Sequence, residues 1–166
     1  MNEYLEFLKQ RRSIRHYKGE QISDEQLAAL QEMAVLSASS RNSQPWHFLI
    51  IQKKEILDHL EELTGLGHPL DGGPTLIVSF GREDATAPVV DSTLAMSNIM
   101  NAAVAVGLGT CYMWSIYYLF HDHPEMAAEY GVPEGYICTG AMVVGIPDET
   151  PKTPVNRKTD CFTVIR

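Results

Sequence analysis

The sequence predicts a fold of the α+β class, with helices packed on one sheet of at least four strands. Helical and strand-like patterns follow one another in mixed order, without the regular βαβ repeat that indicates a parallel sheet. Residues 88–106 are apolar on most faces of a helix, which in a small domain indicates a central helix that also packs on a partner. Residues 74–80 and 136–145 form apolar runs short enough for buried strands.

Two helices are predicted near the start of the chain. Residues 3–11 are expected to form a short helix. Ser23 begins the second, because its hydroxyl and the amide of Gln26 three positions later form a capping box. The apolar residues that follow recur at helical spacing as far as Val35.

The next part of the chain predicts two strands separated by a helix. Residues 47–52 are expected to form the first strand. Residues 53–64 place apolar side chains on one face and charges on the opposite face, which indicates an amphipathic helix. A loop rich in glycine and proline, residues 65–73, then leads to the strand at 74–80.

The long helix at 88–106 comes next, with Pro88 in its first turn and Gly107 after its end. Residues 110–114 are strand-like. Pro124 then begins a short helix that runs to about residue 130.

The last part of the chain predicts one buried strand and one terminal strand. Residues 136–145 are strongly apolar and form the buried strand. Residues 146–158 carry three prolines and are expected to cross the surface. Residues 161–165 alternate well enough to predict a terminal strand, although no later segment is left to pair with it.

Length and composition indicate an ordinary globular protein. We expect one domain, residues 1–166, because 166 residues can bury a real core. No apolar run is long enough to span a bilayer and no basic-then-apolar leader begins the chain, so a cytoplasmic location without membrane contact is expected. The three cysteines are widely spaced and form no CxxC motif, which argues against a disulfide framework and against a zinc site.

The charge distribution argues for a small anionic ligand. A formal net charge of −8 makes nucleic-acid binding an unfavourable interpretation. Against this background, ten positions hold five of the thirteen basic residues: Lys9, Arg11, Arg12, Arg15 and Lys18. Taken alone, such a cluster is also typical of a solvated surface. On an acidic protein, however, local cations suit a small anion better than a polyanion.

A second concentration of polar groups lies at residues 39–44, with the sequence SSRNSQ. These six residues place hydroxyls, a guanidinium and two carboxamides between a predicted helix and a predicted strand. A generic loop needs only one or two polar turn formers, whereas polar groups held by two rigid elements are typical of a binding loop. A hydrogen-bonded turn is the alternative. Trp46, two positions later, is most simply a core anchor at the start of the strand.

The sequence contains no motif for nucleophilic or metal-assisted catalysis. It lacks GxSxG, HExxH, GxxxxGK[ST] and GxGxxG. His121 and His123 flank Asp122, but two histidines on a polar turn are usually a solvated cap, so we predict neither a catalytic side chain nor a metal site. Arginines suit a phosphate, carboxamides suit a ring edge with donors and acceptors, and hydroxyls suit a sugar-like chain. A flavin with a phosphorylated ribityl chain needs all three, and it brings its own reactivity.

The chain resembles the FMN-dependent nitroreductase family, as a short, single-domain member. Residues 11–17, RRSIRHY, are similar to the family's N-terminal R-[RH]-S-[IT]-[RK]-x-[FY] motif, and residues 40–48, SRNSQPWHF, are similar to its S-x-N-x-Q-P-W-x-F motif. GLGTC at 107–111 resembles the end of the family's central helix and the strand after it. VGIP at 144–147 and the proline-rich stretch to Arg157-Lys158 resemble its closing segment. The resemblance covers nearly the whole chain.

The resemblance implies a specific architecture and a shared site. The expected fold is a central, mostly antiparallel sheet of four or five strands flanked by helices, with a long buried central helix and an intertwined homodimer. FMN would lie at the interface of the two subunits. The implied FMN-binding residues are Arg11, Arg12, Ser13, Arg15, Ser39, Ser40, Arg41, Asn42, Gln44, Trp114, Ser115 and Arg157.

The first group of these residues would hold one end and one edge of FMN. The resemblance implies that Arg11, Ser13 and Arg15 hold the phosphate, the ribityl chain and the pyrimidine edge of the ring, and that Arg12 also touches the phosphate end. Arg157, with Lys158 beside it, would close on the phosphate.

The second group would reach FMN from the other subunit. The resemblance implies this for Ser39, Ser40, Arg41 and Asn42, with Gln44 supporting the loop or binding directly.

The third group would lie beside the ring. Trp114 and Ser115 would sit there with a backbone N–H facing N5. Many relatives have glycine at the Ser115 position, so Ser115 and Trp114 could narrow the pocket. Residues 80–88 and the stretch after Ser115 leave little room for the helical lid of longer relatives. The resemblance therefore bears on flavin binding more than on substrate class.

The implied function is an oxidoreductase in which NADH or NADPH reduces FMN and leaves, after which an electron-poor acceptor such as a nitroaromatic or a quinone takes its place. This is a ping-pong mechanism, in which Arg15 would stabilise negative charge at the N1 edge. One alternative keeps FMN but changes the chemistry, to reductive dehalogenation or oxidative handling of a flavin-like ligand. Another is a flavin-binding or sensing protein with negligible turnover. The third is a protein that binds no flavin on a degenerate family scaffold.

Overall fold

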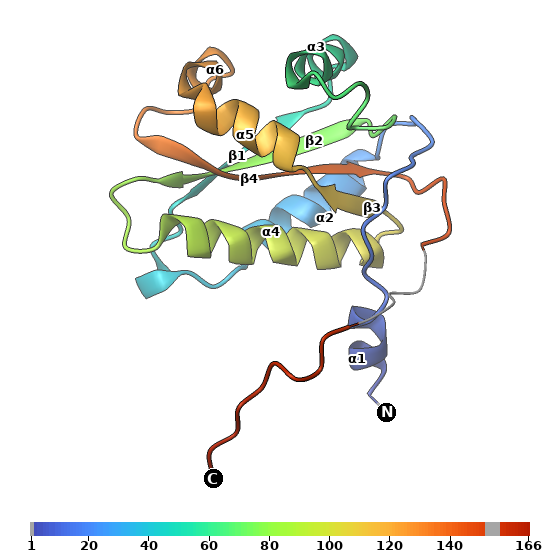
Figure 1. The fold of residues 1–166 in the computed structure, drawn as a ribbon, viewed down its shortest axis with the longest axis vertical. Coiled ribbons are helices and arrows are strands. Elements are labelled where there is room, and N and C mark those ends of the chain that lie inside the picture. Colours follow the sequence, from blue (N-terminus) through green and yellow to red (C-terminus); the bar gives the residue numbers. More distant parts are fainter. Residues whose placement is uncertain (1, 152–156) are drawn as a thin grey trace.

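A four-stranded antiparallel sheet organises the chain, of which the computed structural model describes residues 2–151 and 157–166. The strand order is β1-β2-β4-β3, and each neighbouring pair is antiparallel (Figure 1). The strands are β1 (Trp46–Ile51), β2 (Thr75–Arg82), β3 (Gly109–Tyr112) and β4 (Tyr136–Gly145). The predicted α+β class and the antiparallel sheet are confirmed, and β1 and β3 form the two opposite edges.

Helices cover both faces of this sheet (Figure 1). One face carries α2 (Asp24–Val35) and α4 (Pro88–Ala105). The other face carries α3 (Lys54–Thr64), α5 (Trp114–Asp122) and α6 (Pro124–Glu129). The short helix α1 (Glu3–Leu8) lies outside both layers.

The core consists of two apolar clusters, one on each face of the sheet. Successive residues of β2 alternate between them: Leu76 and Val78 belong to the cluster under α3 and α5, whereas Ile77 belongs to the cluster that packs on α2 and α4. Since side chains alternate along a strand, a strand covered on both faces reads as one apolar run. This explains why residues 74–80 are apolar without a period of two.

The predicted capping box at Ser23 is confirmed, and it connects two helices. The Gln26 backbone N–H donates to Ser23 Oγ at 3.2 Å, and the Ser23 N–H donates to Gln26 Oε1 at 2.9 Å. The Gln26 Nε2 amide also donates to the backbone oxygen of Val106 at 2.9 Å. The start of α2 is therefore fixed against the end of α4.

The long helix α4 packs on the sheet through one side only. Met96, Ile99 and Ala103 are buried in the α2–α4 cluster, whereas Val89 and Val90 are more than half exposed. The predicted central helix is present, and its apolar outer face is left open in the single chain. Among the described helices, neither α4 nor any other has the apolar length that a membrane span requires.

Three sequence predictions of secondary structure were wrong. The expected strand at 110–114 ends at Tyr112, and the following residues form α5, which was not predicted. The first helix ends at Leu8 instead of near residue 11. Residues 161–165 form no strand, because a strand needs a paired neighbour and the tail 157–166 runs away from the sheet (Figure 1).

Candidate functional site

The arginine-rich segment at residues 11–17 lies along the open edge of β3. Ser13 forms a parallel bridge with Thr110, and the Ile14 N–H donates to the Thr110 oxygen at 3.0 Å. Gly109 permits this approach, since a Cβ there would lie 2.5 Å from Ile14 Cγ1. With Ile14 buried as the anchor, its neighbours Ser13 and Arg15 are both exposed.

Residues 146–149 hold the other side of this segment. The Lys18 N–H donates to the Ile146 oxygen at 3.1 Å, and the Asp148 N–H donates to the His16 oxygen at 2.9 Å. The Arg15 N–H donates to Glu149 Oε1 at 2.5 Å, and this bond holds the pKa of the Glu149 carboxyl below its ordinary value. The segment is thus clamped between β3 and the chain after β4.

A pocket of about 400 Å³ opens beside this clamped segment. Its walls come from four parts of the chain, and its lining residues are Arg15, His16, Tyr17, His68, Pro69, Asp71, Cys111, Tyr112, Met113, Trp114 and Val143. The pocket combines a polar wall with an aromatic and apolar wall. This combination suits a flat ligand with one polar edge.

Arg15 provides the free cation of the polar wall. Its guanidinium forms no hydrogen bond or ion pair with another residue in the described part of the chain, whereas His16 Nδ1 pairs with the Asp71 carboxylate. Burial raises the pKa of the Cys111 thiol, an effect that Arg15 opposes, and burial also raises the pKa of Tyr17. Cys111 and Tyr17 are therefore neutral at pH 7, and Arg15 remains available to a ligand.

The buried carboxylate of Glu61 fixes the loop that contains His68 and Asp71. Glu61 of α3 accepts the Leu70 N–H at 2.7 Å through Oε1, and its Oε2 lies 3.3 Å from His68 Nδ1. The sequence analysis did not identify His68 or Asp71 as site residues. The signal that could have found them is a glycine-rich loop beside an acidic residue on the apolar face of a helix.

Arg11 and Arg12 differ in their surroundings. The Arg12 guanidinium donates to the backbone oxygens of Lys9 and Arg11, at 2.5 and 2.8 Å, so it caps the end of α1. The Arg11 guanidinium is partly buried and has no hydrogen-bonding partner within the described residues. Ser13 lies within hydrogen-bonding reach of the Cys111 thiol. Of the four predicted residues in this segment, only Arg15 lines the pocket.

The polar loop at residues 39–44 forms a 3-10 turn, Ser40–Asn42, in a constrained backbone. Arg41, Asn42 and Gln44 have φ values of 54°, 55° and 45°, in the left-handed region that non-glycine residues rarely adopt. The Gln44 N–H donates to Ser39 Oγ at 3.0 Å, and Gln44 Nε2 donates to Asn42 Oδ1 at 3.3 Å. Within this chain, Gln44 supports the loop, which is one of the two predicted roles.

Asp91 of α4 fixes the loop to the body of the protein. Its Oδ1 accepts the Ser40 N–H at 3.0 Å, and its side chain is buried, with the residue only 2% exposed. The second oxygen, Oδ2, is buried without a hydrogen-bond partner among the described residues. Asp91 was not among the residues predicted from the sequence, although an acidic residue in the first turn of an apolar helix is a visible signal.

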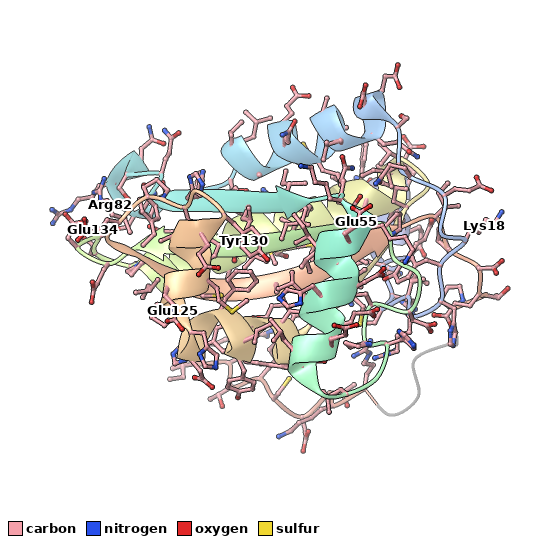
Figure 2. All side chains as sticks on the ribbon, turned by 90° about the horizontal axis from the view of Figure 1, so that it is seen from above. Lys18, Glu55, Arg82, Glu125, Tyr130 and Glu134 are labelled. Carbon is pink, nitrogen blue, oxygen red and sulfur yellow. The ribbon has the colours of Figure 1, made fainter. Side chains whose placement is uncertain are left out.

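Within one chain, the Ser39–Gln44 loop and the arginine-rich segment lie at opposite edges of the sheet. The loop leads into β1 and the arginine-rich segment flanks β3, and these are the two outer strands of the sheet. Figure 2 labels a marker at each end: Lys18 follows the arginine-rich segment, and Arg82 donates its N–H to the Pro45 oxygen at 2.8 Å. The two predicted halves of the site therefore do not meet within a single chain.

The remaining predicted residues divide between the pocket and the tail. Trp114 lines the pocket as the first residue of α5, and its backbone N–H has no intrahelical partner because of that position. Ser115 follows in the first turn and is partly buried. Arg157 is exposed and does not line the pocket.

Comparison with known proteins gives the chain a family. The model of the nitroreductase family matches residues 8–66 and 62–146. The chain is 30% identical over 155 residues to a protein of Archaeoglobus fulgidus provisionally named NADH dehydrogenase/NAD(P)H nitroreductase, and the match covers 90% of this chain and 88% of that protein. It is 27% identical over 179 residues to the NAD(P)H-type FMN reductase of Bacillus subtilis, with 93% of this chain and 70% of that protein covered.

Solved structures agree with this result. A nitroreductase with bound FMN from Desulfitobacterium hafniense has a TM-score of 0.86 at 26% identity, with both chains covered completely. A nitroreductase with bound FMN from Bacteroides fragilis has a TM-score of 0.89 at 23% identity, again with both chains covered completely. The family model spans well over half of the chain, so this protein belongs to the nitroreductase family.

Proposed function

We propose that this protein is an NAD(P)H-dependent flavin oxidoreductase that holds FMN and reduces electron-poor acceptors such as nitroaromatics or quinones by a ping-pong mechanism. One observation carries the proposal: Arg15, whose guanidinium has no partner among the described residues, lines a pocket together with aromatic and apolar side chains. FMN-bound structures among the similar proteins and the FMN reductase relative support the same choice of cofactor.

The residues present fit FMN. A volume of about 400 Å³ lies within the range of roughly 300–1,000 Å³ that is usual for ligand pockets. Met113 and Val143 offer apolar surface to a ring, and Arg15 offers a cation to its pyrimidine edge. Arg11 and Ser13 precede Arg15 on the same strand-like segment, and we assign them to the phosphate and the ribityl chain.

Bound FMN would supply the chemistry by accepting a hydride from NAD(P)H and passing two electrons to the acceptor. For a quinone, the overall change is NAD(P)H, a proton and the quinone going to NAD(P)⁺ and the hydroquinone. The protein needs no side chain as nucleophile or metal ligand. Arg15 would stabilise negative charge at the N1 edge of bound FMN, and the first-turn N–H groups of α5, beginning at Trp114, would be available as donors to the ring.

A homodimer completes the proposed site. The polar loop Ser39–Gln44 does not line the Arg15 pocket of its own chain, so we infer that the same loop of a second copy completes that pocket. The outer face of α4 exposes Val89, Val90 and Leu94, and the tail exposes Phe162 and Ile165. These apolar surfaces suit burial in an interface. We therefore assign Ser39, Ser40, Arg41 and Asn42 to the FMN site of the partner subunit.

The visible spectrum under anaerobic mixing tests this function. We expect the purified protein to be yellow, to release FMN on denaturation, and to bleach within seconds when mixed with NADH or NADPH. A yellow protein that does not bleach with either nucleotide would be a flavin-binding protein without reductase turnover. A colourless protein that fails to take up FMN would contradict the proposed function altogether.

The identity of the acceptor needs a second measurement. After reduction, a quinone or a nitroaromatic added anaerobically should restore the oxidised spectrum, whereas release of halide from a halogenated aromatic would indicate reductive dehalogenation. A cytoplasmic location remains our prediction from the sequence.

A further inference from the structure

Five ring-bearing side chains form a continuous row that starts in the pocket and follows α5. The Tyr112 and Trp114 rings have centroids 5.2 Å apart, and Trp114 contacts Tyr117 at 5.3 Å and Tyr118 at 5.7 Å. The row ends at His121, whose ring lies 5.3 Å from Tyr117. The spacing arises from the helix, because residues three and four apart lie on the same face.

Three members of the row, Trp114, Tyr118 and His121, are exposed, and the first two stack on each other. Trp114 is 59% exposed and Tyr118 is 53% exposed, and their ring planes are only 28° from parallel. The Tyr112 and Tyr117 rings lie behind them in edge contacts, and burial raises the pKa of both phenols, so that these rings stay neutral. Exposed aromatic surface of this extent, next to a pocket, is typical of a binding surface.

The row extends beyond the proposed space for FMN. Trp114 is both a lining residue of the Arg15 pocket and a member of the row, whereas Tyr118 lies one helical turn further along and does not line the pocket. A molecule that uses Tyr118 is therefore a second ligand, which lies next to the flavin. The indole N–H of Trp114 and the phenol of Tyr118 can donate hydrogen bonds to quinone or nitro oxygens.

We propose that Trp114 and Tyr118 form the acceptor-binding wall of this enzyme, against which a planar aromatic acceptor stacks. This inference rests on the proposed function, because it names the residues that select the oxidising substrate at the same site. The two rings stack on a flat aromatic acceptor and make no comparable contact with an acceptor that has no ring. Tyr118 is thereby a specificity-determining residue, whereas Trp114 contacts both FMN and the acceptor.

Steady-state kinetics with two acceptors test the wall. Tyr118→Ala should raise KM for menadione, a planar two-ring quinone, roughly 3- to 10-fold, the range expected for one aromatic contact. KM for ferricyanide, which has no ring, should be unchanged. Tyr118→Phe should retain most of the affinity for menadione because it keeps the ring. Tyr4→Ala, which removes a ring that is 70% exposed on α1, is the matched control.

Direct binding separates failure of the wall from failure of the proposed function. The chain has two tryptophans, so Trp46→Phe leaves Trp114 as the sole indole emitter. Menadione titrated into this oxidised FMN-loaded protein, without NADH, should quench the emission saturably, and Tyr118→Ala should raise the Kd by the same factor as KM. If quenching does not saturate, or if Tyr118→Ala leaves the menadione Kd unchanged, the wall is refuted. Saturable, Tyr118-dependent quenching in a protein that no nucleotide reduces would refute the reductase function and retain the aromatic site.

Discussion

At the scale of single residues, Asp91 is unusual because it is a buried carboxylate with one oxygen unpaired among the described residues. Its buried carboxylate fixes the Ser39–Gln44 loop through one oxygen and leaves the other without a partner in the described structure. Asp91→Ala should leave the Ser40 N–H without an acceptor and destabilise the protein by about 1–3 kcal/mol. Because the loop would lose this hydrogen bond to α4, FMN affinity should fall as well. Thermal unfolding and FMN titration measure the two effects.

Asp91→Asn is the matched control for this prediction. It keeps an oxygen that can accept the Ser40 N–H and removes the charge, so it should restore FMN affinity and most of the stability. If the asparagine variant loses as much FMN affinity as the alanine variant, the role of Asp91 depends on its charge and not on the bond to Ser40.

A substitution of Arg15 can test ligand binding without disturbing the fold, because its backbone and its side chain have different roles. Its backbone N–H makes the structural bond to Glu149, whereas its side chain is free for the pocket. Arg15→Ala should therefore leave the thermal midpoint of the FMN-free protein nearly unchanged and weaken FMN binding roughly 10- to 100-fold, as for loss of a charge-assisted hydrogen bond. Bleaching by NADH should also slow. Lys18→Ala removes a nearby exposed cation and serves as the control; unchanged FMN affinity in Arg15→Ala would refute the assignment.

At the scale of elements, the sequence predicted those whose signal is local. The capping box at Ser23 and the apolar run of β2 are properties of neighbouring residues, and both were found. Helix α5 was missed because its tyrosines and tryptophan favour strands, although Ile116 and Phe120, both buried, have helical spacing. The tail 161–165 alternates like a strand, yet pairing is a property of a neighbour that a sequence pattern does not include.

The same distinction holds for the candidate site. Motifs identified Arg15 and Trp114, which line the pocket, but not His68 or Asp71, whose position depends on the Glu61 carboxylate in another element. Local patterns thus predicted two residues that line the pocket, and long-range packing decided what surrounds them.

The clamp between residues 11–17 and 146–149 predicts a dependence of stability on pH. The Glu149 carboxyl has a lowered pKa in the folded protein, so its contribution is present above the pKa of the unfolded chain and is lost as pH falls through the folded pKa. Glu149→Gln should therefore lower the thermal midpoint by a few degrees at pH 7. The difference from wild type should begin to shrink as the pH falls through about 4, the ordinary range of a glutamate, and should vanish only below the lowered pKa of the folded protein.

A carboxylate on α6 supplies the control for Glu149. Glu129→Gln neutralises an exposed acidic residue far from the clamp, so it should leave the midpoint unchanged across the same pH range. Equal shifts in both variants would mean that net charge, and not the local charge of Glu149 beside the Arg15 N–H, is responsible.

At the scale of the whole molecule, the placement of the two half-sites makes a quantitative prediction. The Arg15 pocket and the Ser39–Gln44 loop flank opposite edges of the sheet, so a shared site must combine one half from each subunit. Arg15→Ala and a Ser40→Ala, Asn42→Ala double variant should each bind FMN poorly as homodimers. In a mixed dimer, one site collects both defects and the other site has none.

Unfolding and refolding the two variants together tests this prediction. Random pairing makes half of the dimers mixed, and half of the sites in mixed dimers are intact, so about a quarter of the wild-type FMN-binding capacity should return. Refolding each variant alone, followed by mixing without unfolding, is the control and should restore none if exchange between dimers is slow. If both half-sites served FMN within one chain, every site would carry a defect and co-refolding would restore nothing. The fraction of tightly bound FMN therefore decides between a site built by one chain and a site that only two chains can complete.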